Sequence, residues 1–311
     1  MSFKEKWKNG NTRRTLVATN NVFGWISFFV LFVYAFSFLF PFFWSVITSF
    51  RDPVSFLMER FEGYGIFPKD WFAPTTWANN YQTVLQTLAI PSRNPDGSLH
   101  MIGIGEMISN SLLYAVGCTA FSVLTCLLVA YAVAMFNFKY CKVMYTVIII
   151  QMILPIVGSF PSQIRMATAL NLYDSIPGMW IMSSYVSGLY FLVFHGAFKL
   201  IPKDYAEAAH LDGAGNFRVM VSIMIPFVKG SIFTIALMKF IGLWNDYMSP
   251  YLYMPTHPTI SYGVYWLTVG SRTGDTPTQL AATTLLAIPL LAFFIAFQKQ
   301  LLGDLTVGGL K

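Results

Sequence analysis

The chain has 311 residues, of which 55% are hydrophobic and only 11% are charged, whereas a soluble domain carries roughly 25% charged residues. This composition excludes an ordinary soluble globular domain and favours a membrane protein. We therefore interpret the formal net charge of +6 as charge in loops beside a membrane rather than as a surface for nucleic acid.

Six segments are apolar and approach the roughly 20 residues that a helix needs to cross a bilayer. They cover about residues 22–50, 110–136, 143–160, 176–198, 231–251 and 280–297. The sequence therefore predicts an all-α membrane protein whose six-span domain occupies residues 22–298. Residues 1–21 precede this domain and residues 299–311 form a tail. An even number of spans places both termini on one side.

The distribution of Lys and Arg predicts which side that is. Thirteen of the 20 basic residues lie in the N-terminal segment, in the two loops around residues 137–142 and 199–230, and in the tail, whereas six lie in the loops of the other side. Cytoplasmic loops carry the excess of Lys and Arg. We therefore expect both termini and the loop 199–230 in the cytoplasm.

The longest hydrophilic stretch, residues 51–109, is then external. Within it, residues 77–81 are typical of the start of a short helix that lies on the membrane face. Residues 91–98 are rich in Pro, Asn, Asp, Gly and Ser, which predicts a turn-rich projection.

The loop 199–230 predicts a helical elbow outside the bilayer. Pro202 suits the first position of a helix, and Asp204 and Glu207 suit its first turns, where carboxylates favour the positive helix end. Gly213 and Gly215 are expected to stop this helix. Asn216 is expected to cap a second short helix, residues 217–225, that Pro226 ends. Ala208 and Ala209 would leave a flat face that another protein can approach.

The same loop carries the pattern E-A-A, three residues, G, nine residues, I-x-L-P, with Ile225 in place of Leu. The residues on the pattern are Glu207, Ala208, Ala209, Gly213, Ile223 and Pro226. This loop resembles the signature of the membrane permeases of binding-protein-dependent ABC importers. The resemblance implies the type I importer permease fold and a coupling role for these six residues and Asp212. In that family the glutamate pairs with a basic residue of the ATPase, a role that would fall on Glu207.

Further segments are similar to the carbohydrate-uptake branch of these importers, in particular to the smaller maltose-type permease. They are residues 110–112, 152–155, 240–246 and 297–310. The resemblance implies a bacterial inner-membrane protein that pairs with a second, homologous permease. Two cytoplasmic ATPase subunits, which bind ATP and Mg, and an external solute-binding protein would complete the importer. The family's tail reaches the ATPase, which would involve residues 306–311.

The sequence predicts no catalysis in this chain. It lacks the G-x-x-x-x-G-K-[ST] loop that cradles nucleotide phosphates, and it lacks H-E-x-x-H. Cys118, Cys126 and Cys141 have no C-x-x-C spacing, which favours packing roles over a disulfide or a metal site. We expect no cofactor and no metal in the chain itself.

Lys239 and Asp246 are charges within the fifth predicted span. A charge there usually faces a cavity or a partner, and seven residues apart the two share one helix face. Together with Trp244 and Asn245 they could line the translocation pathway. The alternatives are a structural pair with the second permease and a side chain that extends to the interface.

Three other functions remain open from the residues alone. An ABC importer permease for a peptide or polyamine would carry the same signature loop. An ion-coupled secondary transporter would predict acidic or His relays and often inverted repeats, for which only Lys239 and Asp246 are candidates. The third alternative is a membrane anchor or structural subunit without transport activity. An ATPase subunit bound to the chain would exclude the last two.

Overall fold

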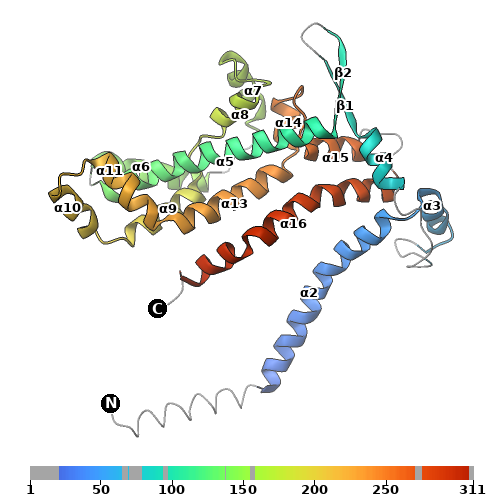
Figure 1. Ribbon diagram of the computed structural model, residues 1–311, viewed down its shortest axis with the longest axis horizontal. Helices are drawn as coiled ribbons and strands as arrows, with labels where there is room; N and C mark the ends of the chain where they lie inside the picture. Colours follow the sequence, from blue (N-terminus) through green and yellow to red (C-terminus); the bar gives the residue numbers. More distant parts are fainter. Residues whose placement is uncertain are drawn as a thin grey trace. The chain divides into compact units, whose positions relative to one another are not determined.

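A computed structural model describes residues 21–64, 69, 79–93, 97–136, 138–154, 158–269 and 275–307. The chain divides into two compact units. The first comprises residues 1–81 and 275–284, and the second comprises residues 82–274 and 285–311. The described part is dominated by helices, as the composition predicts (Figure 1).

The first unit contains the long helix α2 (Asn21–Ser49) and the short helix α3 (Pro53–Phe61). The side chains of α2 that the structure describes are nearly all exposed and apolar up to Phe43, which is the surface that lipid or a partner helix requires. The end of α2 is held by polar contacts, because Asn80 Nδ2 donates to the carbonyls of Ser49 (2.8 Å) and Arg51 (2.7 Å). Arg51 in turn forms an ion pair of 2.6 Å with Glu59 on α3.

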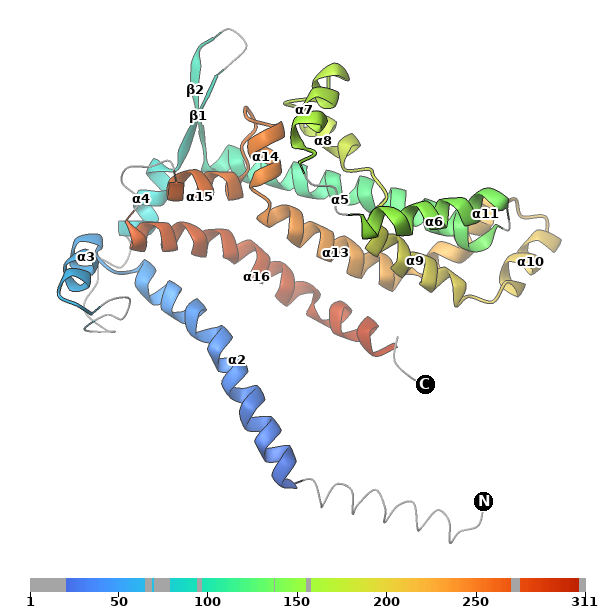
Figure 2. The same ribbon diagram turned by 180° about the vertical axis from the view of Figure 1, so that it is seen from behind.

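The short helix expected to start within residues 77–81 is α4 (Asn79–Thr87). Residues 77 and 78 lie outside the described residues. The segment expected to be a turn-rich projection forms a β-hairpin, and its composition did not predict the two strands. Strands β1 (Ala89–Arg93) and β2 (Leu99–Gly103) pair antiparallel, with Ile90 opposite Ile102. Both isoleucines are buried at the base of the hairpin. Figure 2 shows the hairpin projecting from the start of α5.

Helix α5 (Ile104–Met135) is the centre of the second unit and packs against α6, α8, α9, α13 and α15. Its buried face carries small side chains at a spacing of three or four residues, among them Ala115, Cys118, Ser122, Cys126 and Ala130. Small residues at this spacing let helix backbones approach closely in a membrane. The buried cysteines Cys118 and Cys126 lie within this packing.

The partner helices of α5 follow in chain order, and Figure 1 shows α9 and α13 alongside it. They are α6 (Lys139–Ile153), α8 (Ile176–Met182), α9 (Gly188–Lys199), α13 (Lys229–Asn245) and α15 (Ile260–Val269). Two further short helices of the second unit are α7 (Phe160–Ala169) and α14 (Met248–Tyr253). Three phenylalanines of α9, at positions 191, 194 and 198, are fully buried and fill the core at one end of the unit.

Three helices of the described residues are long and apolar enough to cross a membrane: Gly24–Ser49, Ile104–Met135 and Thr276–Ala296 of α16 (Thr276–Val307). A fourth candidate is a pair, Asn216–Phe227 and Lys229–Asn245, bent by 75°. The other predicted spans are shorter here. α6 has 15 residues, and the span 176–198 is divided into α8 and α9. The six-span count therefore stays a prediction.

Candidate functional site

The elbow predicted for the loop 199–230 is present in the second unit. Helix α10 (Asp204–Leu211) and helix α11 (Asn216–Val219) are joined by a turn at Gly213, whose φ is +82°. The amide of Ala214 donates to the carbonyl of Ala209 (2.9 Å), and that of Gly213 to the carbonyl of His210 (3.0 Å). These two bonds are the Schellman arrangement, which requires a left-handed residue at Gly213.

The ends of these helices differ in detail from the prediction. Pro202 lies outside α10, which begins at Asp204. Asn216 does not cap the second helix but is its first residue, and Gly215 precedes it without a side-chain cap. Pro226 does not end the segment. A π-helical turn, η1 (Met220–Met224), leads into α12 (Ile225–Phe227), which contains Pro226. A proline lacks the N–H that an α-helix needs at this point, and a π turn before it shifts the hydrogen-bond register.

The signature residues divide into an exposed and an inward-facing group. Glu207, Ala208, Asp212, Gly213 and Pro226 are exposed, and among the described residues neither carboxylate forms an ion pair. Ala209 is only 8% exposed and packs in the core with Val219 and Met224. The expectation that both alanines form one open face is therefore wrong for Ala209. Its small side chain instead lets α10 lie close to α11 and η1.

A shallow cleft of about 380 Å³ lies beside the elbow, lined by Tyr205, Ser222, Ile223, Pro226 and Phe227. The rings of Tyr205 on α10 and Phe227 on α12 are 5.1 Å apart between centres. The cleft therefore places the Ile and Pro of the signature next to the helix that carries its Glu. Two parts of a pattern spread over twenty residues, the E-A-A helix and the I-x-L-P segment, therefore lie next to each other.

The residues expected to line a pathway lie at the end of α13 and make internal contacts. The indole N–H of Trp244 donates to the carbonyl of Leu286 (3.3 Å). Asp246 accepts from the Tyr114 hydroxyl (3.1 Å) and from the Ser249 amide in the first turn of α14 (3.0 Å). Asn245 is exposed and bonds within its own helix. These contacts give Trp244 and Asp246 structural roles, and their place on a pathway stays a prediction.

Lys239 is half-buried, and its Nζ lies 5.5 Å from the centre of the Tyr185 ring. Within the described part of the chain it forms no ion pair with Asp246 or with another carboxylate. The helix face shared by Lys239 and Asp246 thus does not bring the two charges into contact.

A polar cluster that the sequence did not indicate connects two loops by hydrogen bonds. Asp174, with a φ of +56°, accepts from the Thr256 amide (3.0 Å) and from its hydroxyl (2.7 Å). Tyr253 adds a bond of 2.6 Å from its hydroxyl to Gln163 on α7. The one local signal is the run Asn171 to Asp174, because Asn and Asp tolerate the left-handed conformation.

Comparison with known proteins agrees with the resemblance noted for the signature loop. Residues 122–305 match the family described as binding-protein-dependent transport system inner membrane component. The chain is 25% identical over 276 residues to the sulfoquinovosyl glycerol transport system permease protein of Agrobacterium fabrum, covering 88% of this chain and 89% of that one. It is 27% identical over 278 residues to the trehalose/maltose transport system permease protein of Thermococcus litoralis, covering 88% and 91%.

Its fold resembles a chain of a solved bacterial ABC transporter involved in the import of the acidic polysaccharide alginate. The TM-score is 0.72 at 19% sequence identity, over 90% of this chain and 97% of that one. A likeness at this identity concerns the fold, and it extends over nearly the whole of both chains.

Proposed function

The chain belongs to the family of binding-protein-dependent transport system inner membrane components, and we propose that it is the permease subunit of an ATP-driven importer for a sugar or oligosaccharide. In this proposal it forms half of the translocation pathway in a bacterial inner membrane. The family consists of subunits that do not themselves catalyse ATP hydrolysis. An ion-coupled secondary transporter and a simple membrane anchor do not fit this membership.

The substrate class rests on the named relatives. Proteins named for the transport of a sulfoquinovosyl glycerol and of trehalose or maltose align with 88% of this chain. Both names denote sugars or glycosides. A peptide or polyamine is a poorer candidate, because these two relatives are named for the transport of sugars or glycosides.

The exposed elbow is the observation that supports coupling to an ATPase subunit. Glu207 is exposed and forms no ion pair with another described residue, and its helix ends in the left-handed turn at Gly213. Such a helix is a projection that another protein can receive. We propose that the elbow docks on an ATPase subunit. Glu207 would then face a basic residue of that subunit, and the cleft at Tyr205 and Phe227 would receive one of its apolar side chains. Closure of the ATP-bound subunits would then move α13 through the bend of 75° at its start.

The remaining architecture follows from this proposal. The chain has six spans. Four are the three long helices and the bent pair described above, and α6 and the pair α8–α9 are the other two. Both termini and the elbow are cytoplasmic, and the hairpin is external. Within the second unit, the elbow and the hairpin lie at opposite ends of α5, as this orientation requires (Figure 2). A second permease, two ATPase subunits and a solute-binding protein are the partners.

The test is a charge reversal in the assembled transporter. Glu207→Lys should leave the chain in the membrane but lower ATPase co-purification and sugar uptake by at least about tenfold, because a docked ion pair becomes a repulsion. Glu62→Lys makes the same change on an exposed residue after α3 and is the control. Wild-type co-purification and uptake in Glu207→Lys would refute the docking role.

A further inference from the structure

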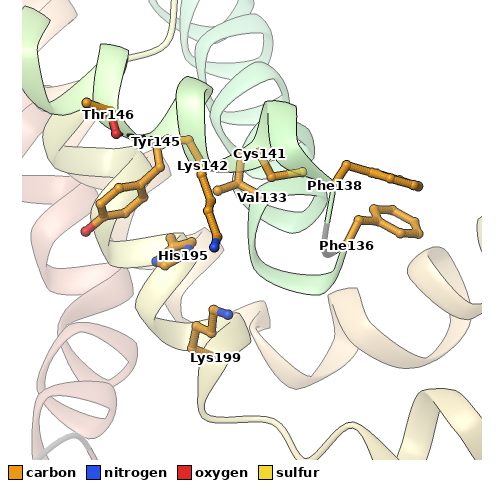
Figure 3. A pocket seen from close by; sticks show the side chains of 9 residues that line it. All are labelled: Val133, Phe136, Phe138, Cys141, Lys142, Tyr145, Thr146, His195 and Lys199. Carbon is orange, nitrogen blue, oxygen red and sulfur yellow. Dashed lines mark hydrogen bonds between the residues drawn. The ribbon is translucent and has the colours of Figure 1, made fainter.

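A cavity of about 530 Å³ lies where three helices of the second unit meet, at the end of α5, the start of α6 and the end of α9 (Figure 3). It is separate from the cleft of the elbow. Its polar lining consists of Lys142, Tyr145 and Thr146 on α6 and of His195 and Lys199 on α9. Figure 3 shows the Lys142 side chain directed toward His195 and the last turn of α9.

The cavity has a cationic lining that includes Lys142 and Lys199. Among the described residues, Lys142 and Lys199 form no ion pair with a carboxylate. The His195 ring is held between Tyr145 (5.1 Å between centres) and Phe191 (5.7 Å). Two ammonium groups at one opening repel each other, and an anion between them would remove that repulsion.

The rest of the lining and the surface beyond it are apolar. Phe136 and Phe138, whose rings stack at 5.7 Å, line the side toward α5. The helix face that carries Lys142 and Thr146 continues along α6, at helical spacing, with Ile149, Ile150 and Ile153. Ile150 is 48% exposed and Ile153 is 72% exposed. A cationic pocket thus opens onto an apolar track that runs away from it along a predicted membrane span.

We propose that this cavity binds the phosphate headgroup of an anionic phospholipid, with an acyl chain on the isoleucine track of α6. The inference rests on the proposed orientation, in which the ends of α5 and α9 lie at the cytoplasmic leaflet. Basic pockets between helices on that side bind anionic headgroups. A free phosphate would satisfy the lysines but leaves the apolar track unused. Bound lipid would fix α6 against α9 near the chain segment that leads to the elbow.

The experiment counts lipid on the assembled transporter by native mass spectrometry after purification from nanodiscs with equal phosphatidylglycerol and phosphatidylcholine. The test variant is Lys142→Gln with Lys199→Gln. The control is Lys139→Gln with Lys229→Gln, which removes two exposed charges from the same predicted side. Bound phosphatidylglycerol should fall by at least about tenfold in the test variant and by less than about twofold in the control. Lys142→Arg with Lys199→Arg should retain it.

A second measurement remains informative if the test variant does not assemble. Phosphatidylglycerol with a photoreactive headgroup should label wild-type peptides that contain residues 139–146 or 195–199. Labelling confined to other segments, or equal lipid loss in the test and control variants, overturns the proposal. Inorganic phosphate that displaces the label while acyl-chain length has no effect would assign the site to a free anion instead. Lipid retained by the isolated chain but absent from the complex would show that a partner covers the cavity, which also overturns it.

Lipid retention does not depend on transport. A complex that holds phosphatidylglycerol through Lys142 and Lys199 but takes up no sugar would contradict the proposed function and leave the lipid site standing.

Discussion

The ammonium group of Lys239 lies 5.5 Å from the centre of the Tyr185 ring, which brings α13 against the loop between α8 and α9. A cation over an aromatic face is attracted by the ring quadrupole, by about 0.5–2 kcal/mol depending on desolvation. This contact gives the lysine an internal partner that the sequence did not indicate.

We therefore predict that Lys239→Met lowers stability but leaves sugar uptake per assembled complex near the wild-type value. Met fills similar space without the charge. Tyr185→Leu should lower the free energy of unfolding by a similar amount. The double variant should lower it by less than the sum of the two single variants, because the two residues share one interaction. Thermal unfolding of the detergent-solubilised complex measures this. Normal stability with altered sugar preference would instead place Lys239 on the pathway.

The elbow provides a prediction with an internal control. Gly213→Ala forces a side chain into a φ of +82° and should destabilise the turn by about 1–2 kcal/mol. Gly215 lies two residues further on, has an ordinary φ and has open space around it, so Gly215→Ala should leave the stability nearly unchanged. Gly213→Pro should act more strongly, because it also removes the bond from the Gly213 amide. ATPase co-purification and uptake report the effect, and equal results for the two alanine variants would show that the left-handed turn is unimportant.

A close approach between helices gives a third prediction. A Cβ on Gly117 would lie 2.0 Å from the indole nitrogen of Trp180, which donates to the Leu113 carbonyl (2.9 Å). Gly117→Ala should displace that indole and cost about 1–3 kcal/mol of stability. Gly105→Ala, on the same helix but with open space around it, is the control. An unchanged melting temperature for Gly117→Ala would mean that Trp180 can move at no cost.

The ion pair between Arg51 and Glu59 predicts a pH dependence. The hydrogen bond from Arg51 lowers the pKa of the Glu59 carboxyl below its ordinary value. The pair therefore contributes stability above the unfolded-state pKa, near 4.3, and loses it as the pH falls through the lowered pKa. Glu59→Gln should destabilise the protein at pH 7, and the difference from wild type should disappear in acid. Glu62→Gln, on an exposed residue of the same segment, should show no such trend.

The hairpin offers a prediction about the external partner. Deleting residues 92–98 removes the outer part of the hairpin but keeps the buried Ile90 and Ile102 at its base. We expect normal assembly and a reduced stimulation of ATP hydrolysis by the solute-binding protein. A milder variant, Leu99→Ser with Met101→Ser, changes two exposed apolar side chains on β2. Unchanged stimulation and uptake in both variants would assign the hairpin to passive surface.

The parts of the structure that the sequence predicted well are those with a local cause. Runs of apolar residues predict α2, α5 and α16, and Gly213 predicts the turn that ends α10 because few other residues adopt its φ. The hairpin was missed because its strands are short and contain Pro91 and Gly103, which are uncommon in strands.

The sequence motif predicted which residues form the site, but their contacts depend on the packing of the helices. Periodicity placed Lys239 and Asp246 on one face, but it could not show that Tyr185 and Tyr114 are their partners. Which of two adjacent alanines faces the core depends on α11 and η1, which lie later in the chain. Of the tail residues 306–311 that were predicted to reach the ATPase, residues 308–311 lie outside the described residues.

The position of α5 at the centre of the second unit has a consequence for biogenesis. Its buried face, including Asn110, Ser111 and Ser122, contacts helices that the ribosome makes later. The end of α13 follows the end of α5 by about 110 residues, which take roughly 5–20 seconds to synthesise. During that interval the buried face of α5 lacks the helices that later cover it, and Asn110 still lacks the Pro258 carbonyl to which it donates in the folded chain.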